Sequence, residues 1–411
     1  MSLKKIIFPI SSMFFAIAFL AIGYGMILTF IGVYLKEMGI SSSIIGLING
    51  SFFLGAVLSS IFSQKIISTV GHIRSFAAFT SLMVITFLIH SLFFDVTLWI
   101  VLRIISGFSF YALLIIIESW LNEKSNEEDR SKILAIYTII FYLSTAIGQL
   151  FLNIDEDFKQ SIFTIGSVLV LVSVIFISLT KIKEPILKPF ERYSFPKIYS
   201  VVPLATVGSF ISGYFVGGFF AMLPVYILLK SDSVETVSFF MIIGLIGGLI
   251  SQWPIGLLSD KYGRRKLISI TAFITAITSI LFILFSQTNE YLNILGFLLG
   301  LTIFAMYPLS VARANDVVDE NKDVIEISRT LLFTYGIGSF VAPLLIGFGI
   351  SYFNPNFLFI SYTILGLFLS FYALTKDKIP HEELSVFVNM PVASGAELPE
   401  MDPRQDESFD N

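Results

Sequence analysis

The chain has 411 residues, of which 55% are hydrophobic and only 14% charged, with a mean hydropathy of +0.85 and a formal net charge of −4. An average soluble domain carries about 25% charged residues, so this composition excludes an ordinary soluble protein and indicates a chain that crosses a membrane many times. Cysteine is absent, which excludes disulfide, iron–sulfur and thiolate chemistry.

Twelve apolar stretches are each long enough, at roughly 20 residues, to cross a bilayer as a helix. The first is too long for the core of a signal peptide, so we expect an uncleaved membrane helix there. In chain order the predicted helices cover 8–34, 42–64, 76–94, 97–121, 132–153, 161–180, 200–229, 236–258, 267–286, 291–312, 330–352 and 356–375. The sequence therefore predicts an all-α membrane protein with twelve transmembrane helices.

The positive charges predict the orientation. Of the 26 Lys and Arg, all but Lys36, Arg103, Lys159 and Lys230 fall in loops or termini on one side of the predicted membrane. Because positively charged loops stay in the cytoplasm, that side is predicted to be cytoplasmic, and an even number of spans places both termini there. We expect a monomeric, multi-pass protein of a bacterial inner membrane, in contact with the lipid bilayer.

Two polar segments divide the chain. Residues 181–199 form the longest polar connection and are rich in Lys, Arg and Pro. We expect a cytoplasmic linker there, between an N-terminal six-helix bundle at 1–180 and a C-terminal one at 200–376. The rest, 377–411, is acidic, contains four prolines and lacks apolar periodicity, which predicts a disordered cytoplasmic tail.

A charged stretch with the sequence GLLSDKYGRRK separates the eighth and ninth predicted helices. It resembles the loop signature of the major facilitator superfamily, G-x-x-x-D-[RK]-x-G-R-[RK]. The matching residues are Gly256, Asp260, Lys261, Gly263, Arg264 and Arg265. The resemblance covers roughly residues 6–376 and implies two parallel, pseudo-symmetric six-helix bundles. It also implies that the loop is a conformational latch, in which Asp260 pairs with Arg264 or with a helix end across the halves.

The two halves repeat weakly. At a constant offset of 192 residues, Gly55, Gly71 and Arg74 match Gly247, Gly263 and Lys266. In the fourth and tenth spans, Gly107 is matched with Gly296. The first-half loop departs from the signature, since Ser68 and Thr69 stand at its charged positions, which argues against a salt bridge there.

The fourth predicted helix carries two tryptophans 21 residues apart, about 31 Å along a helix, which matches the thickness of the hydrocarbon. We expect Trp99 and Trp120 to be interfacial anchors. This places Arg103 about 6 Å inside the periplasmic boundary. Arg103 followed by Gly107 resembles the superfamily's signature in this helix. Arg103 would either contact the path of a proton or anion, or snorkel to the periplasmic interface.

Glu118 is the only acidic residue clearly inside a predicted span, about 3 Å from the cytoplasmic boundary. This depth favours a gating or structural role, through pairing with basic residues such as Arg74 or Lys132. The alternative is a proton carrier, protonated while buried and ionised when the cavity opens.

Uncharged polar side chains near the middle of the predicted helices are candidates to line a substrate cavity, although each could instead be a buried structural group. They are Tyr24, Asn49, Tyr137, Tyr142, Gln149, Tyr214, Gln252, Tyr307 and Tyr335. Such a cavity would suit a neutral or amphipathic solute. A dianion or sugar phosphate would call for several basic residues near midspan, and Arg103 is the one that is visible.

Two further patterns bear on the branch of the family. The fifth predicted helix has Ala146 to Gln149 where drug–proton antiporters carry a Gly-Pro pair, which weakens the case for drug efflux. The run ESWLNE, beginning at Glu118, together with Arg130 and the stretch 134–137, resembles the YcaD-like bacterial branch of the superfamily.

We therefore expect a secondary active transporter of a small organic solute, working by alternating access and powered by a proton gradient, without a cofactor, metal or nucleic acid. The sequence shows no P-loop and no histidines at metal-ligand spacing, so an enzyme is not expected. A membrane-embedded enzyme would need a polar catalytic cluster at one interface. The remaining alternative is a non-transporting sensor built on the same fold.

Overall fold

The computed structural model describes residues 3–124, 127–154, 159–179, 202–285, 289–317 and 324–379. The predicted linker at 181–199, and the predicted tail from residue 380 onward, lie outside these residues. The helices are α1 (Leu3–Glu37), α2 (Ser42–Val70), α3 (His72–Leu92), α4 (Val96–Lys124), α5 (Glu127–Leu150), the 3-10 turn η1 (Phe151–Asn153), α6 (Ser161–Ser178), α8 (Pro203–Ala221), α9 (Leu223–Ser231), α10 (Val234–Tyr262), α11 (Arg264–Phe285), α12 (Asn289–Asn315), α13 (Val324–Tyr352) and α14 (Phe357–Leu374).

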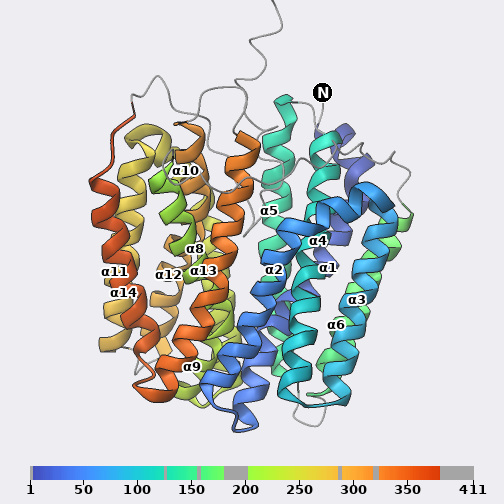
Figure 1. Cartoon of the computed structure of the whole chain (residues 1–411), viewed down its shortest axis with the longest axis horizontal. Helices are drawn as coiled ribbons and strands as arrows, with labels where there is room; N and C mark the ends of the chain where they lie inside the picture. The colour runs from blue at the N-terminus through green and yellow to red at the C-terminus, as the bar shows by residue number, and fades with distance from the viewer. Residues whose placement is uncertain are drawn as a thin grey trace, which may run out of the picture.

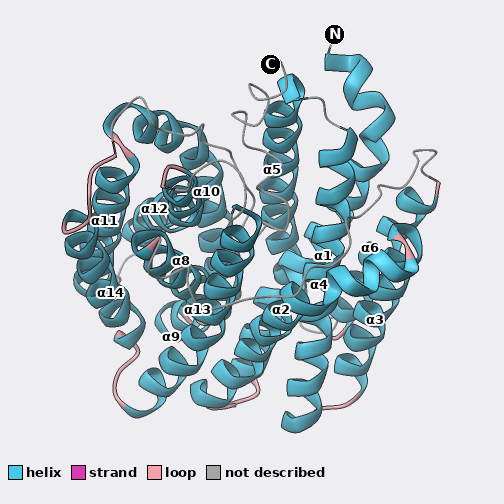
Figure 2. Cartoon of the chain, turned by 45° about the horizontal axis from the view of Figure 1, so that its top comes forward, coloured by secondary structure: helices cyan, strands magenta, loops and turns pink. Residues whose placement is uncertain are grey.

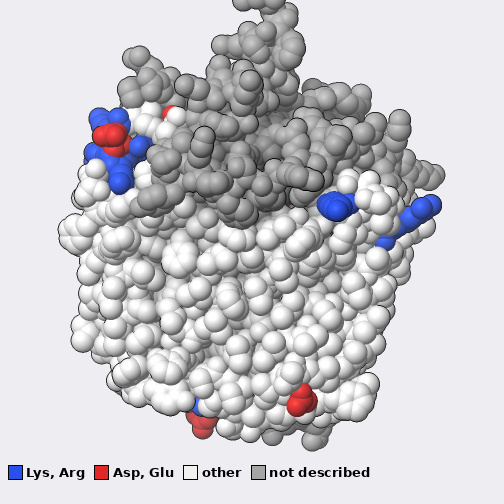
Figure 3. All heavy atoms as spheres, in the orientation of Figure 1, with Lys and Arg blue, Asp and Glu red and all other residues white. Residues whose placement is uncertain are grey.

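Within the described ranges, twelve helices are long and apolar enough to cross a membrane, as predicted. Their outer surface is apolar, with large side chains such as Trp253 and Phe371 exposed by 71% and 64%. On the face shown in Figure 3, Lys, Arg, Asp and Glu gather at the two ends and leave the middle uncharged. Such a surface is stable in lipid, so the chain is a multi-pass membrane protein.

The seventh predicted span is not one helix. The prediction of a continuous helix over 200–229 is wrong, because the helix is interrupted at Met222, between α8 and α9. Pro224 causes the break: it has no N–H to donate, and its ring would clash with the carbonyl of Phe220 in a continuous helix.

The twelve helices form two groups of six, which stand side by side in Figure 1 and from the tilted view of Figure 2. In the first half, α2 packs on α4, α1 on α5, and α3 on α6; in the second, α10 packs on α12, α8 on α13, and α11 on α14. Between the halves, α2 packs on α13 and α5 on α10. These pairs are equivalent, which confirms the predicted pseudo-symmetry of two parallel bundles.

Glycines allow equivalent close contacts in each half. A Cβ on Gly55 would strike the backbone of Ile104, and a Cβ on Gly107 would strike that of Phe52. In the second half, a Cβ on Gly247 would strike the carbonyl of Phe297, and a Cβ on Gly300 would strike that of Gly244. The structural counterpart of Gly107 is therefore Gly300. The predicted match with Gly296 is wrong by about one turn, because Gly296 packs instead against the ring of Phe240.

Gly107→Val should destabilise the first half. The added side chain would force α4 away from the Phe52 carbonyl, and overpacking of this kind costs about 1–3 kcal/mol. Thermal unfolding in detergent should show a lower apparent Tm than in Ser81→Val, a control on the exposed face of α3. Equal apparent Tm values in the two variants would show that the helices separate there at little cost.

Candidate functional site

The turn at Gly71, between α2 and α3, has the same backbone conformation as the turn at Gly263, between α10 and α11. Their φ angles are +93° and +88°, with extended ψ, a conformation essentially limited to glycine. We name the end of the bundle that carries these turns the signature face, and the other end the opposite face.

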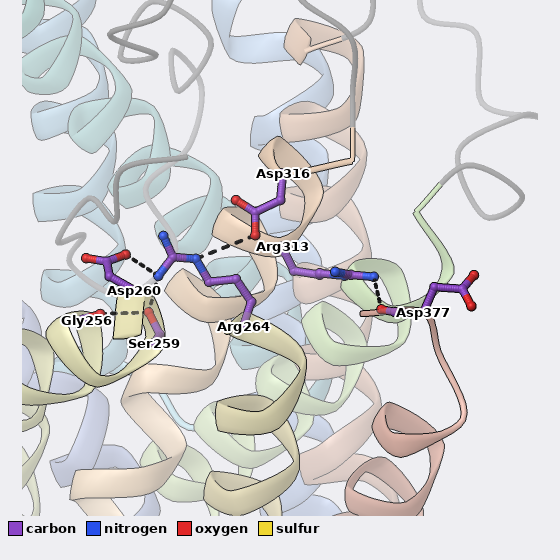
Figure 4. Close-up of polar contacts among 7 residues, drawn as sticks. All are labelled: Gly256, Ser259, Asp260, Arg264, Arg313, Asp316 and Asp377. Carbon is purple, nitrogen blue, oxygen red and sulfur yellow. Dashed lines mark hydrogen bonds and ion pairs between the residues drawn. The ribbon is translucent and has the colours of Figure 1, made fainter. Parts of the chain in front are cut away.

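Two of the predicted latch residues, Asp260 and Arg264, form part of a polar cluster at the signature face that is centred on the buried Arg264 (Figure 4). The Arg264 side chain is 0% exposed; its Nη1 lies 2.5 Å from Asp260 Oδ1, and its Nε lies 3.7 Å from Asp316 Oδ2. Arg264 also donates to the hydroxyl of Ser259, which in turn donates to the carbonyl of Gly256. One guanidinium therefore joins the ends of α10, α11 and α12. Of the two partners expected for Asp260, the structure shows Arg264, in the same half.

Neighbouring arginines fix the end of α14 to this cluster. Arg265 Nη1 donates to the carbonyl of Lys376 at 2.6 Å. Arg313 Nη2 donates to that of Asp377 at 2.8 Å (Figure 4). Both carbonyls lie just beyond the end of α14 at Leu374, so these hydrogen bonds tie the segment that follows α14 to α11 and α12. Lys261, by contrast, is exposed, with its ammonium 5.4 Å from the ring of Tyr262.

The first half carries no acid at the position of Asp260, which is Ser68. His72 occupies the position of Arg264 and is buried against Trp120, with ring centroids 5.6 Å apart, while Arg74 is exposed. Trp120 and Trp99 are both 0% exposed. The prediction of interfacial anchors is therefore wrong: both rings fill space between helices, and Trp99 donates to the carbonyl of Phe93 at 2.7 Å.

The contact surface between the halves, which we name the seam, is tight toward the opposite face. A Cβ on Gly46 of α2 would strike the backbone of Pro343 in α13, and the backbone N of Ser43 donates to Ser351 Oγ at 2.8 Å. On the pseudo-symmetric side, Ser238 Oγ of α10 donates to the carbonyl of Gln149 in α5 at 2.7 Å. These contacts close the seam between α2 and α13 and between α5 and α10 toward this end.

The middle of the seam brings together tyrosines from α1, α4, α5, α12 and α13. The side chain of Tyr335 lies near those of Tyr24, Tyr111, Tyr142 and Tyr307, close enough for their hydroxyls to interact. All five side chains are buried. The rings of Tyr307 and Tyr335 are 4.8 Å apart, and the Tyr335 hydroxyl makes no hydrogen bond in the structure. Such a cluster can offer aromatic surface and hydrogen bonds to a solute, but no charge of its own.

Glu118 lies beside this cluster, between it and the signature face. Its carboxylate is buried and accepts a hydrogen bond of 2.9 Å from the hydroxyl of Tyr137. Glu118 also lines a narrow pocket between the halves, with Tyr111 on one side and Tyr335 on the other. The pocket has room for roughly one water molecule. An ionisable group thus lies at the seam, in reach of the tyrosines.

Arg103 is buried rather than snorkelling. The residue is 1% exposed, and its guanidinium carbon lies 4.5 Å from the centre of the Phe52 ring. Nε and Nη2 have no hydrogen-bond partner. The prediction that Arg103 reaches the periplasmic interface is therefore wrong, whereas a contact with an anion or proton path stays a prediction.

The sequence model of one protein family, the Major Facilitator Superfamily, matches residues 13–252 and 205–392, which together cover most of the chain. The chain belongs to the major facilitator superfamily. The YcaD MFS-type transporter of Escherichia coli O6:K15:H31 (strain 536 / UPEC) is 24% identical over 357 residues, 86% of this chain and 91% of that protein. An MFS-type transporter of Enterobacter sp. (strain 638) matches over the same shares, also at 24% identity.

Solved structures show the major facilitator fold. The nucleoside transporter NupG has a TM-score of 0.74 at 15% identity and covers 89% of this chain and 98% of its own. A bacterial homolog of the human lysosomal transporter Spinster has a TM-score of 0.67 at 13% identity and covers 91% and 96%. At this identity the likeness concerns the fold alone.

The other predicted cavity residues of this major facilitator protein divide into seam and packing groups. Asn49 Nδ2 crosses the seam to the carbonyl of Ala221 at 3.0 Å, and Gln252 Nε2 reaches the Tyr142 hydroxyl at 3.5 Å. Gln149, in contrast, donates to the carbonyl of Gly25 at 2.8 Å, which joins α1 and α5.

Tyr137 and Tyr214 also lie away from the tyrosine cluster. Tyr137 is the hydrogen-bond donor to Glu118. Tyr214 packs against Tyr362 of α14, with ring centroids 6.2 Å apart. For both residues, as for Gln149, the structure favours packing within one bundle over contact with a solute.

Sequence reasoning missed Tyr111, Arg313 and Asp316. Tyr111 lies near the middle of the predicted span 97–121, and this depth could have identified it. Arg313 and Asp316 follow the tenth predicted span and looked like solvated loop residues. Only the packing of α12 on α11 shows that the Asp316 side chain is 0% exposed beside Arg264.

Proposed function

We propose that this protein is a secondary active transporter of a small neutral or amphipathic organic solute, working by alternating access and driven by protons. It acts as a monomer in the bacterial inner membrane, with the signature face and both termini in the cytoplasm. The proposal is supported above all by the seam, which is closed by backbone contacts toward the opposite face and lined by tyrosines at its middle. The basic loops at the signature face support the orientation.

The latch supports transport over the alternative of a non-transporting sensor. Arg264 joins three helix ends of one half through ion pairs and a hydrogen bond. A half held in this way moves as one body, which alternating access requires.

The test is flux into proteoliposomes that contain the purified full chain. A panel of labelled neutral and amphipathic solutes is offered with and without an imposed pH gradient. Accumulation that follows the gradient, and that a protonophore abolishes, supports the proposal, and the side of accumulation gives the direction. Saturable binding without flux under any gradient would favour the sensor.

We propose further that Glu118 takes up the coupling proton. It is a buried carboxyl at the edge of the pocket in the seam, and opening of this pocket would expose it to water. The titratable groups facing this region are Tyr137 of α5, Tyr111 of α4, Tyr335 of α13 and His72 of α3, the last through Trp120. Glu118 is the carboxylate among them.

Glu118→Gln should therefore uncouple transport. Amide cannot ionise, so we expect flux to lose its dependence on pH between about 5 and 8, and accumulation against a gradient to stop, while downhill exchange persists. Tyr137→Phe is the matched control, since it removes the hydrogen bond and keeps the carboxyl. If Glu118→Gln keeps the wild-type pH profile, Glu118 has the gating or structural role instead.

A further inference from the structure

Arg103 is a buried cation without an anion near it. In the described part of the chain no carboxylate lies within ion-pair distance, and two of its three nitrogens make no hydrogen bond. Its titratable neighbours are Tyr24 and His90, and neither supplies a negative charge. The His90 ring donates from Nδ1 to the carbonyl of Thr86, 2.5 Å away. An arginine buried in this way is costly unless something pairs with it.

The second half shows that packing does not require this charge. By the offset that relates Gly107 to Gly300, the counterpart of Arg103 is Gly296, and its space is filled by the ring of Phe240. The counterpart of His90, at the offset of 192, is Phe282. The same fold is thus built with apolar groups at both positions, so the arginine in the first half needs another explanation.

The surroundings of Arg103 lead to the seam through aromatic rings. Phe52 lies against the guanidinium, and Tyr24 stacks on Phe110 with centroids 3.8 Å apart. Tyr24 in turn lies 6.2 Å from Phe220 of the second half, ring to ring. A ligand that enters from the seam would therefore meet aromatic surface first and the guanidinium behind it, once these rings move aside.

We infer that Arg103 receives the carboxylate of an amphipathic organic acid, whose apolar or aromatic body lies against Tyr24, Phe52 and Phe110 after these rings have moved apart. A guanidinium matches a carboxylate with two parallel N–H donors, and the bond is strong in a site without water. Among the described residues Arg103 is the one cation at this depth, which suits a ligand with a single negative charge. This inference rests on the proposed function and specifies its substrate class.

Binding tests the inference without any flux measurement. Thermal unfolding of the purified full chain in detergent is followed with 4-phenylbutyrate and with its uncharged analogue 4-phenylbutan-1-ol. The acid should raise the apparent Tm in a saturable way, and the alcohol should do so at least about tenfold less potently, as the loss of a charge-assisted hydrogen bond predicts. Equal effects of acid and alcohol would overturn the inference even if no variant folds.

Variants then assign the effect to this side chain. Arg103→Gln should lose the response to the acid, and Arg103→Lys should keep part of it. Lys230→Gln is the control, because Lys230 also lies near an aromatic ring, 5.8 Å from that of Tyr226, but at the opposite face. An undiminished response in Arg103→Gln would overturn the inference, as would a response to sodium chloride equal to that to the acid, which would indicate a site for inorganic anions. Failure of flux with intact acid binding would instead count against transport.

Discussion

A disulfide between cysteines introduced at Ser43 and Ser351 is expected to abolish transport, and its reduction to restore it. The backbone N of Ser43 and Ser351 Oγ are 2.8 Å apart, between α2 and α13, where the seam is tightest. Their helices are close enough for the Cα separation of up to about 7 Å that a disulfide permits. If the solute leaves or enters by opening this end, the bond holds it shut, and flux should fall to the level of empty liposomes.

The absence of native cysteine makes this experiment clean, because the introduced pair can form only one intramolecular disulfide. A protease site placed in the 181–199 connection reports the bond, since cross-linked halves stay together on a non-reducing gel. The single variants Ser43→Cys and Ser351→Cys control for loss of the side chains and should transport under oxidant. Full flux through cross-linked protein would rule out alternating access at this seam.

Much of the fold could be predicted because lipid restricts the choices. Each span must satisfy its own backbone hydrogen bonds, so hydropathy alone identifies twelve helices. The glycines at Gly71 and Gly263 were equally readable, because a chain that reverses between two membrane helices within one residue needs a positive φ. The interruption of the seventh span could also have been predicted, because Pro224 lies inside the predicted range 200–229 and a proline interrupts a helix. The length of the apolar stretch favoured one continuous helix instead.

The site could be predicted only in part, because it depends on which helices touch. Depth along a helix rises by about 1.5 Å per residue and can be counted, and it gave Tyr24, Tyr142, Tyr307 and Tyr335. It could not distinguish these from Tyr214, since the direction of a side chain is decided by neighbours far away in the sequence. The same limit applied to Arg103, for which the same depth allowed a snorkelling side chain or a buried one.

Removal of the Arg264 side chain should have the largest effect on the stability of the second half. Arg264 and Asp316 are both 0% exposed, so Arg264→Ala leaves the Asp316 carboxylate buried without this cation. Breaking a buried pair by removing one partner costs about 3–5 kcal/mol. We expect a clear fall in apparent Tm in detergent, together with slowed flux, because α10, α11 and α12 no longer share one ion-paired centre.

Asp260→Ala provides the matched comparison within the same cluster. Asp260 is 43% exposed and pairs with Arg264 across the turn at Gly263, and ion pairs with solvent-exposed groups are worth only about 0–1 kcal/mol. Its removal leaves Arg264 beside Asp316, so we expect slower transport of an unchanged range of solutes with little loss of stability. If Asp260→Ala unfolded as readily as Arg264→Ala, the stability of the cluster would depend on the exposed pair. A changed range of solutes would indicate that the latch contacts the transported molecule. The ratio of the two Tm shifts therefore separates a structural ion pair from a mobile one, and only the mobile one can open and close during transport.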